Sequence, residues 1–481
     1  MGIYIYTLRR YVIHAELWII RKNNMKQLKA KLLTLSVLSG LMLTACNDSN
    51  DHDDVQVITP PVTIPTPTTD CMWREAATSR SHTGADPENF AYPDTNVNYW
   101  ASQFTIPEGA KVYLDGDYPY ARHSSLVSYT AAGERVNSLR DVEIVPNQGV
   151  TNPFIIGNNR LDKARGYQAE IKLGNQPTTP EQNTLYAPKT ETNDVAVLYR
   201  IYVPNKGYNL QAGVSLPRFK VVLANGEEKR GNDVCQVLKV KNQGISKAAI
   251  TSKELFTSLV GTQNSLGFPA QTIPKWYTAY NGPANVACIY KLKGLTQCEG
   301  FQTERKLNHW ATPDNEYVFA TLSRDLGKVA ILRAKAPTTT KTLNNDAIVS
   351  NADMRYWSIC TNELASTATN YCLYDEEVTK RDADGYYNIV VSLPEDRPNN
   401  ATESCGYHYL ESSPRGAGYP ELGAKNNHLN FLLMRHLLPS PSFKNSIQNT
   451  KIWGDEEQVM GEYLPKITYT SKADFEAKGC N

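Results

Sequence analysis

The sequence predicts a mainly β protein with two tandem, duplicated antiparallel β-sandwich or jelly-roll-like domains and a short helix-containing connector. Two observations support this prediction. The composition favours strands and turns, because the 481 residues include 28 Tyr against 11 Phe, together with 29 Gly and 27 Pro. In addition, a series of short segments occurs twice in the same order. Such a series indicates a tandem duplication.

The repeat is clearest in three pairs of segments. Each residue of the second copy follows its counterpart by 233 to 235 positions, so the register barely changes along the repeat. A further stretch, 99–114, matches 317–332 at an offset of 218 positions. The three pairs are Tyr120–Val127 with Asp353–Cys360, Leu139–Ile144 with Leu373–Val378, and Leu198–Pro204 with Leu433–Pro439.

Short segments in which polar and apolar residues alternate predict strands with one buried face. Asp115-Gly116 and Asp384-Gly385 are pairs typical of hairpin turns. Between the copies, Ser252–Val260 carries an apolar stripe behind a Ser/Thr cap and predicts one helix. The expected strands are 99–106, 109–114, 122–129, 142–146, 166–173, 195–204 and 219–223, then 317–323, 327–332 and 386–393.

The N-terminal region is similar to a bacterial lipoprotein signal peptide. Met25–Lys31 is basic, Leu32–Leu43 is an apolar run too short to span a bilayer comfortably, and Leu43-Thr-Ala-Cys46 resembles a lipobox. The resemblance implies cleavage before Cys46 and lipidation of that residue, which makes a stable membrane anchor. A secretory signal cut elsewhere, or a buried helix, is the alternative. We expect a bacterial cell-envelope protein that faces the periplasm or sits at the outer membrane.

The chain therefore divides into six predicted segments. Residues 1–24 are a dispensable upstream extension, with a second N-terminal helix as the alternative. The acidic and Pro-rich composition of 46–70 is typical of a solvated tether. The predicted segments are 1–24, the signal peptide 25–45, the tether 46–70, the first sandwich domain 71–240, the connector 241–315 and the second sandwich domain 316–481.

Eight Cys remain after Cys46, an even number that suits disulfides in an exported protein. The repeat places Cys360 and Cys372 on two adjoining strands, and Cys288 and Cys298 close a short loop. Three connectivities are open for the other four Cys. We favour Cys71 with Cys235, and Cys405 with Cys480.

One set of charged residues occurs in both copies. An Arg side chain can make a bidentate pair with a carboxylate, so we interpret the set as a structural brace between neighbouring strands of each copy. Binding of an anion or carboxylate by Arg122 or Arg355 is the alternative. The set comprises Arg122, Asp141, Glu143 and Arg200, repeated as Arg355, Asp375, Glu377 and Arg435.

Two His residues, His123 and His408, are weak candidates for catalytic acid-base groups, because each occurs in one copy only and lies among Tyr residues. The extra loop around Thr338–Asn351 is likewise unique to the second copy. Asp382–Gly385 resembles part of a calcium loop but lacks further ligands, so we expect a hairpin turn and no metal site. We expect Trp and Tyr side chains such as Trp276 to pack in the core, with a stacking platform for a sugar or an apolar ligand as the alternative.

Four segments of the second domain carry a family resemblance: Arg355–Ser358, Asp384–Val391, His408–Leu410 and Phe431–Pro439. They resemble a bacterial family of exported proteins known as domain of unknown function 1214. His408-Tyr-Leu stands where that family has Trp-Leu-Pro. The resemblance implies a jelly-roll fold and supplies no settled activity.

These observations favour a lipid-anchored envelope protein that acts as a binding or structural module, with a small-molecule, lipid or glycan ligand or a protein partner. The alternative is an envelope hydrolase or other enzyme with a His-containing site between the domains. Gly-x-Ser-x-Gly, His-Glu-x-x-His, phosphate-loop and dinucleotide motifs do not occur, so no cofactor is expected. The net charge of +1 gives no reason to expect nucleic acid.

Overall fold

The computed structural model describes residues 71–76, 89–241, 272–286, 300, 303–306, 310–341, 352–364, 366–416 and 428–480. Every described residue belongs to one compact unit, Val62–Asn481. None of the helices in these ranges is long and apolar enough to cross a membrane. Several predictions lie outside the described residues. They are the extension 1–24, the signal peptide 25–45, the lipobox at Cys46, the tether 46–70, the helix over Ser252–Val260, the pairing of Cys288 with Cys298 and most of the loop around Thr338–Asn351.

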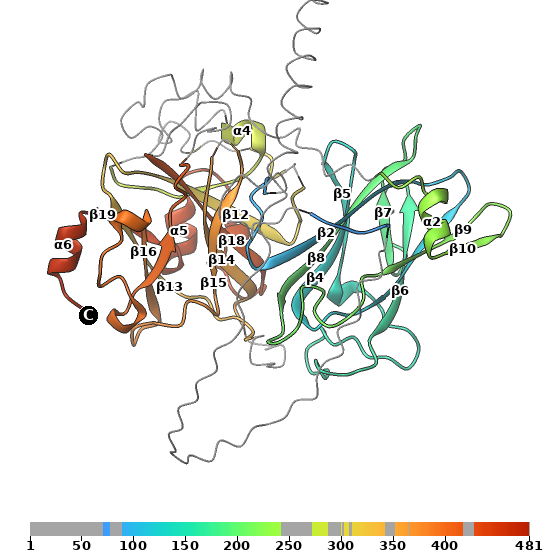
Figure 1. Ribbon diagram of the computed structural model, residues 1–481, viewed down its shortest axis with the longest axis horizontal. Helices are drawn as coiled ribbons and strands as arrows, with labels where there is room; N and C mark the ends of the chain where they lie inside the picture. The colour runs from blue at the N-terminus through green and yellow to red at the C-terminus, as the bar shows by residue number, and fades with distance from the viewer. Residues whose placement is uncertain are drawn as a thin grey trace, which may run out of the picture. The chain divides into compact units, whose positions relative to one another are not determined.

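The prediction of a mainly β fold is confirmed, because the strands form four sheets (Figure 1). We call 71–241 the N-terminal half and 272–480 the C-terminal half. One sheet of the N-terminal half has the order β1 (Arg74–Glu75), β2 (Val97–Thr105), β8 (Asp194–Pro204), β4 (Ala121–Tyr129), β5 (Arg135–Arg140). The other has the order β10 (Glu228–Arg230), β9 (Arg218–Val222), β3 (Lys111–Asp117), β6 (Gly166–Leu173), β7 (Thr184–Ala187).

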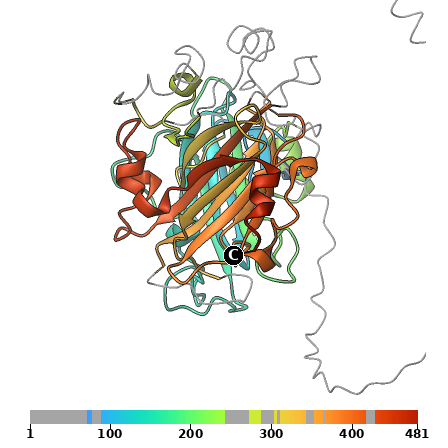
Figure 2. The ribbon, with the colours of Figure 1, turned by 90° about the vertical axis from the view of Figure 1, so that its left-hand side faces the viewer.

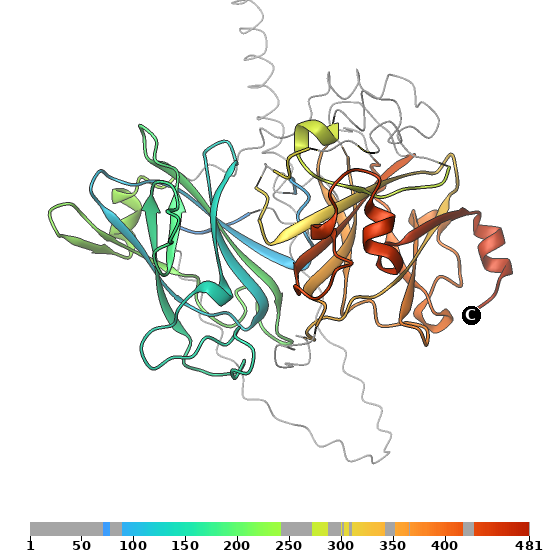
Figure 3. The same ribbon diagram turned by 180° about the vertical axis from the view of Figure 1, so that it is seen from behind.

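The C-terminal half repeats this plan; Figure 2 shows its orange to red strands side by side, and Figure 3 shows the ribbon from behind. Its first sheet has the order β11 (Tyr277–Thr278), β12 (Asn315–Ser323), β18 (Leu429–Pro439), β14 (Met354–Asn362), β15 (Thr369–Tyr374). Its second sheet has the order β17 (His408–Glu411), β16 (Tyr386–Ser392), β13 (Val329–Lys335), β19 (Lys466–Thr470).

Helical segments are short; most of them connect strands, and the last one follows β19. The α-helices are α2 (Asn232–Val237), α4 (Gly282–Val286), α5 (Glu456–Met460) and α6 (Lys472–Ala477). The 3-10 turns are η1 (Asp141–Glu143), η4 (Pro394–Asp396), η5 (Glu403–Cys405), η7 (Ile447–Asn449) and η8 (Gly461–Tyr463).

Strand register confirms the alignment of the two copies. Ser125 lies opposite Arg200, and Ser358 lies opposite Arg435, at the predicted offsets of the repeat, 233 and 235 positions. The strand pairs β6–β7 and β16–β17 are both parallel, whereas the other named pairs are antiparallel. The duplication therefore extends to the order and direction of corresponding strands.

A second correspondence was not predicted. The indole N–H groups of Trp73 and Trp276 donate to the carbonyl oxygens of Pro217 and Pro465, each at 2.7 Å, just before β9 and β19. Trp276 precedes β11, which pairs with β12. The sheet of the C-terminal half thus begins inside the segment that was predicted as the connector, 241–315.

Each half has its own apolar core on the inner faces of its sheets. In the N-terminal half Phe104, Val112, Leu114 and Leu126 are fully buried, and Ala320, Leu332, Ile389, Met434 and others take these roles in the C-terminal half. Burying one such side chain stabilises the fold by roughly 1.5–3 kcal/mol.

Four central strands, however, are buried on both faces. Strand β4 is buried at all positions, and β8, β14 and β18 are buried at nearly all of theirs. The predicted alternation of buried and exposed residues is therefore wrong in these strands. Their outer faces pack against the other half, as the mixed cluster of Tyr202, Val203, Tyr356 and Leu437 shows.

Three predicted disulfides are present. Cys71 pairs with Cys235, Cys405 with Cys480, and Cys360 with Cys372. The last pair joins residues directly opposite each other on β14 and β15, as the repeat suggested.

Candidate functional site

The duplicated Arg and Asp residues pair across the two halves. Arg122 of β4 donates to both carboxylate oxygens of Asp375, at 2.6 and 2.5 Å, and also to Glu376. Arg355 of β14 donates to Asp141 at 2.9 and 3.1 Å. We predicted that each Arg pairs with a carboxylate of its own copy. This prediction is wrong, because each Arg pairs with the Asp of the other copy. The reason is that the ends of β4 and β14 lie against the other half, which brings the other copy's carboxylate closer.

The carboxylates of Asp141 and Asp375 also accept hydrogen bonds from groups of their own half. Asp141 starts the turn after β5 and accepts the backbone N–H of Ser124 at 2.8 Å. Asp375 follows β15 and accepts the backbone N–H of Trp357 at 3.3 Å and the hydroxyl of Thr339 at 2.9 Å. These hydrogen bonds hold the Asp side chain in place, so its pairing with the Arg of the other half costs little further side-chain entropy.

The other members of the set have local roles. Glu143 pairs with Arg140 at the surface. Glu377 accepts from the Tyr371 hydroxyl at 3.1 Å, and burial raises the pKa of Glu377 to about 7. These two residues therefore do not take part in the pairing between the halves.

A second pair of carboxylates, Asp94 and Asp314, was missed by sequence reasoning. Each follows a Pro just before the first long strand of its half, and this repeated Pro-Asp was the available signal. The spacing to the matched Tyr99 and Tyr317 differs by two residues, which hid the correspondence.

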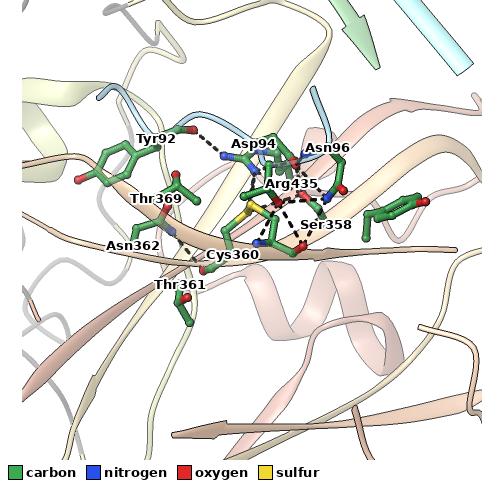
Figure 4. The surroundings of a disulfide bond; sticks show 12 residues. Tyr92, Asp94, Asn96, Ser358, Cys360, Thr361, Asn362, Thr369 and Arg435 are labelled. Carbon is green, nitrogen blue, oxygen red and sulfur yellow. Dashed lines mark hydrogen bonds and ion pairs between the residues drawn. A yellow bond between two sulfur atoms is a disulfide. The ribbon is translucent and has the colours of Figure 1, made fainter. Parts of the chain in front are cut away.

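Asp94 reaches into the C-terminal half (Figure 4). It accepts hydrogen bonds from the Tyr356 hydroxyl at 2.8 Å, the Ser358 hydroxyl at 2.7 Å and the Arg435 guanidinium at 2.7 Å. Arg435 also donates to the Tyr92 carbonyl oxygen at 2.7 Å. All of these side chains except Tyr92 are buried, so the carboxylate is fully compensated within the interface.

The segments that carry these Asp residues lie on hairpins of the opposite half. The backbone N–H of Tyr92 donates to the Thr367 carbonyl at 2.7 Å, and that of Trp310 donates to the Gly133 carbonyl at 3.0 Å. We call 89–96 and 310–314 the arms. Tyr92 and Trp310 both have positive φ, 51° and 65°, a conformation that persists in such residues only when surrounding contacts hold it.

His123 lies in the centre of this interface. Its Nδ1 is 2.8 Å from Asp141 and its Nε2 is 3.4 Å from Asp314, and the side chain is fully buried. Burial alone would lower the pKa of His123, but the two carboxylates raise it. Burial acts in the opposite direction on Asp141, where Arg355 and His123 prevail and lower the pKa to about 2. His123 therefore forms a buried ionic bridge between Asp141 and Asp314, and each of its ring nitrogens contacts one of these carboxylates.

His408 lies elsewhere. Its Nε2 accepts the backbone N–H of Lys380 at 3.0 Å, and its Nδ1 is 3.8 Å from Glu403. Burial lowers the pKa of His408, which favours the neutral ring, and Nε2 acts as an acceptor. Both contacts lie within the C-terminal half. The structure therefore does not bring His123 and His408 together.

The disulfide Cys360–Cys372 borders the arm of the N-terminal half. Nη1 of Arg435 lies 2.8 Å from Sγ of Cys360 and 3.6 Å from Sγ of Cys372. Asp94 and the two sulfurs lie within 4.8 Å of one another, a spacing that a metal ion accepts. The sulfurs are bonded to each other, however, and Arg435 supplies the positive charge beside Asp94. This chemistry does not fit a metal in the oxidised protein.

Asp382–Gly385 forms the expected hairpin turn. Asp382 accepts the backbone N–H groups of Asp384 and Tyr386 at 3.1 and 2.8 Å, and Gly385 has a φ of 87°. Arg333 pairs with Asp382 at 2.5 Å. The carboxylate of Asp382 therefore stabilises the turn and pairs with Arg333.

No protein-family model and no curated protein matches the sequence. Similar solved structures include an uncharacterized protein from Burkholderia cenocepacia, with 9% identity over 80% of this chain and 79% of that chain and a TM-score of 0.42. Another is the VPA0106 protein from Vibrio parahaemolyticus, with 11% identity over 80% and 92% of the chains and a TM-score of 0.35. The resemblance to domain of unknown function 1214 stays a prediction.

Proposed function

We propose that this chain is a lipid-anchored protein of the bacterial cell envelope whose two halves act as one rigid binding or structural module. The observation that carries the proposal is the reciprocal pairing of Arg122 with Asp375 and of Arg355 with Asp141. Buried ion pairs tolerate little relative motion, because separating the partners leaves uncompensated charges in an apolar setting. A module of this kind presents a fixed outer surface to a partner or ligand.

The burial of both His candidates supports a module over an enzyme. His123 is 0% exposed and His408 is 2% exposed. A general acid or base must come within hydrogen-bond reach of a substrate. Both ring nitrogens of His123 already contact carboxylates. An enzyme that uses either His would have to open the fold first.

Membrane anchoring rests on Cys46 and its preceding lipobox, and the tether of 46–70 would separate the module from the membrane. The test is fractionation of cells that express the full chain. We expect the wild-type protein in the membrane fraction after a high-salt wash, and Cys46→Ala in the soluble fraction. Ser49→Ala, three residues later, is the matched control and should fractionate like the wild type. Retention of Cys46→Ala in the membrane would contradict the anchor.

The module itself is tested by activity. The purified full chain is incubated with a panel of lipids, esters and glycans, alongside His123→Gln and His408→Gln. We expect no turnover by any of the three proteins. Turnover that is lost in either variant would overturn the non-enzymatic assignment and favour the enzyme with a His-containing site.

A further inference from the structure

Two sheets face each other across the interface between the halves: the sheet that contains β4 and β8, and the sheet that contains β14 and β18. The outer faces of these two sheets carry the same row of three side chains. Residues directly opposite each other on antiparallel strands point to one face of the sheet. Arg200 lies opposite both Tyr99 of β2 and Ser125 of β4. The corresponding row in the C-terminal half is Tyr317, Arg435 and Ser358.

In the C-terminal half this row holds a carboxylate. Oδ2 of Asp94 accepts from Nη1 of Arg435 and from the hydroxyl of Ser358, each at 2.7 Å. The Tyr356 hydroxyl is the third donor, at 2.8 Å. A guanidinium, a serine hydroxyl and one further donor are therefore arranged around a single carboxylate group.

In the N-terminal half the same two donors have no acceptor among the described residues. Nη1 of Arg200 and Oγ of Ser125 are buried and make no hydrogen bond within the described part of the chain. Their residues are 3% and 2% exposed. Nη2 of Arg200 is used, since it donates to the Tyr129 hydroxyl at 2.7 Å and to the Trp310 carbonyl at 2.5 Å.

Asp314, the counterpart of Asp94, does not fill this place. It lies 3.4 Å from His123 and accepts from Thr312 at 3.0 Å. Position 123 is His where the C-terminal half has Tyr356, and an imidazole between two carboxylates attracts Asp314 more strongly than a hydroxyl does. Arg200 consequently has no ion pair with a carboxylate among the described residues.

We propose that Arg200 and Ser125 bind a small monovalent anion, for which the carboxylate of Asp94 in the other half is the template. A buried guanidinium without a counter-charge is strongly unfavourable, and an anion at Nη1 would supply both the charge and the acceptor. Arg140, the other cross-strand neighbour of Ser125, adds positive charge nearby. The negative charge of Asp314, which lies 3.9 Å from Nε of Arg140, restricts the site to an ion of low charge.

The arm 310–314 lies over Arg200 and limits the size of the anion. The arm residue Trp310 packs on Tyr129, with ring centroids 5.0 Å apart, and its carbonyl oxygen occupies the Nη2 side of Arg200. A large or extended ligand would displace this arm. Formate is itself a carboxylate with a single negative charge and chloride is a single-atom monovalent anion, so both are small relatives of the side-chain carboxylate that Arg435 binds in the other half.

The test is thermal unfolding of the purified full chain in sodium formate, sodium chloride and sodium gluconate at equal ionic strength. We expect formate, chloride or both to raise Tm by about 2 °C over gluconate, with a rise that follows the logarithm of concentration. A rise in formate alone identifies a carboxylate site, and a rise in chloride alone identifies a halide site. Equal Tm values in all three salts would overturn the proposal.

Two variants separate the site from general salt effects. Ser125→Ala should lose most of the anion-dependent rise, whereas Ser358→Ala, the matched control, should keep it because Asp94 already occupies that row. Ser125→Asp brings its own carboxylate to Arg200 and should abolish the dependence while the protein stays folded. An unchanged rise in both Ser125 variants would contradict the assignment of the site.

Discussion

Arg122 of the N-terminal half donates to both carboxylate oxygens of Asp375 in the C-terminal half, and both side chains are fully buried. Arg355 returns the same contact to Asp141. The two halves thus contact each other through equivalent residues of the duplicated sequence, as the subunits of a symmetric dimer do. The arms that carry Asp94 and Asp314 repeat this reciprocity.

Removal of the Arg122 guanidinium should strongly destabilise the protein. Arg122→Met leaves Asp375 buried without its main partner, and we expect a loss of about 3–5 kcal/mol in the free energy of unfolding. Arg230→Met is the matched control, because Arg230 is 57% exposed and pairs with Glu228 and Asp115 at the surface, so its removal should cost about 0–1 kcal/mol. Urea unfolding measures both. Equal losses in the two variants would contradict the role of the buried pair.

His123 should make stability depend on pH. Asp141 and Asp314 raise the pKa of His123 in the folded state. The contribution of His123 to the free energy of unfolding is therefore complete below the pKa of an unfolded His, about 6.5, and is lost as pH rises through the pKa of the folded state. Burial lowers the pKa of His408, and that of His436 to about 3, and these two groups act with the opposite sign. The profile of the wild type alone therefore mixes both effects.

Comparison with His123→Gln isolates the first effect. The difference in Tm between wild type and variant should be largest below a pH of about 6.5 and should shrink as pH rises further. Arg355 and Arg140 are the cations that face the same carboxylates, Arg355 at 2.9 Å from Asp141 and Arg140 at 3.9 Å from Asp314, and both are unchanged in the variant. A difference that is constant, or that grows with pH, would show that His123 is not held as an ion.

Gly133 should be needed for docking of the arm at Trp310. A Cβ at Gly133 would lie 2.9 Å from the Trp310 ring, and the φ of Gly133 is 82°. Gly149→Ala is the control, because Gly149 has a similar φ of 79° and open space around it. We expect Gly149→Ala to cost about 1–2 kcal/mol from backbone strain alone, and Gly133→Ala to cost measurably more. Equal costs in urea unfolding would argue against a tightly packed arm.

The three described disulfides should differ in their resistance to reduction. Cys360 and Cys372 are fully buried, whereas Cys71 and Cys480 are exposed. A thiolate reductant needs access to sulfur, so Cys360–Cys372 should be reduced last under native conditions. Timed reduction, alkylation and peptide mass spectrometry give the order. Early modification of Cys360 would contradict the burial of this bond.

The fold could be predicted because the repeat and the strand patterns are local features. Matched segments such as Leu198–Pro204 and Leu433–Pro439 gave the correct strands, register and disulfide between β14 and β15. The partners of Arg122 and Arg355 could not be predicted in the same way. Polar residues that alternate with apolar ones indicate an exposed face, but in β4 and β8 that face is covered by the other half.

The Asp94 and Asp314 contacts were missed for a related reason. A repeated Pro-Asp is visible in the sequence, but its function depends on residues some 190 to 340 positions away along the chain. Periodicity within a strand carries no information on such distant contacts. Only the packing of the two halves shows that each Asp serves the opposite copy.

A double-mutant cycle between Arg122 and Asp375 tests the reciprocal pairing most directly. Arg122→Met, Asp375→Asn and the double variant are unfolded in urea, together with a second cycle between Arg122 and Asp141, the partner within its own copy. We predict a coupling of about 1–3 kcal/mol between Arg122 and Asp375, and a much smaller one between Arg122 and Asp141. Additive effects in the first cycle, or stronger coupling in the second, would contradict the account.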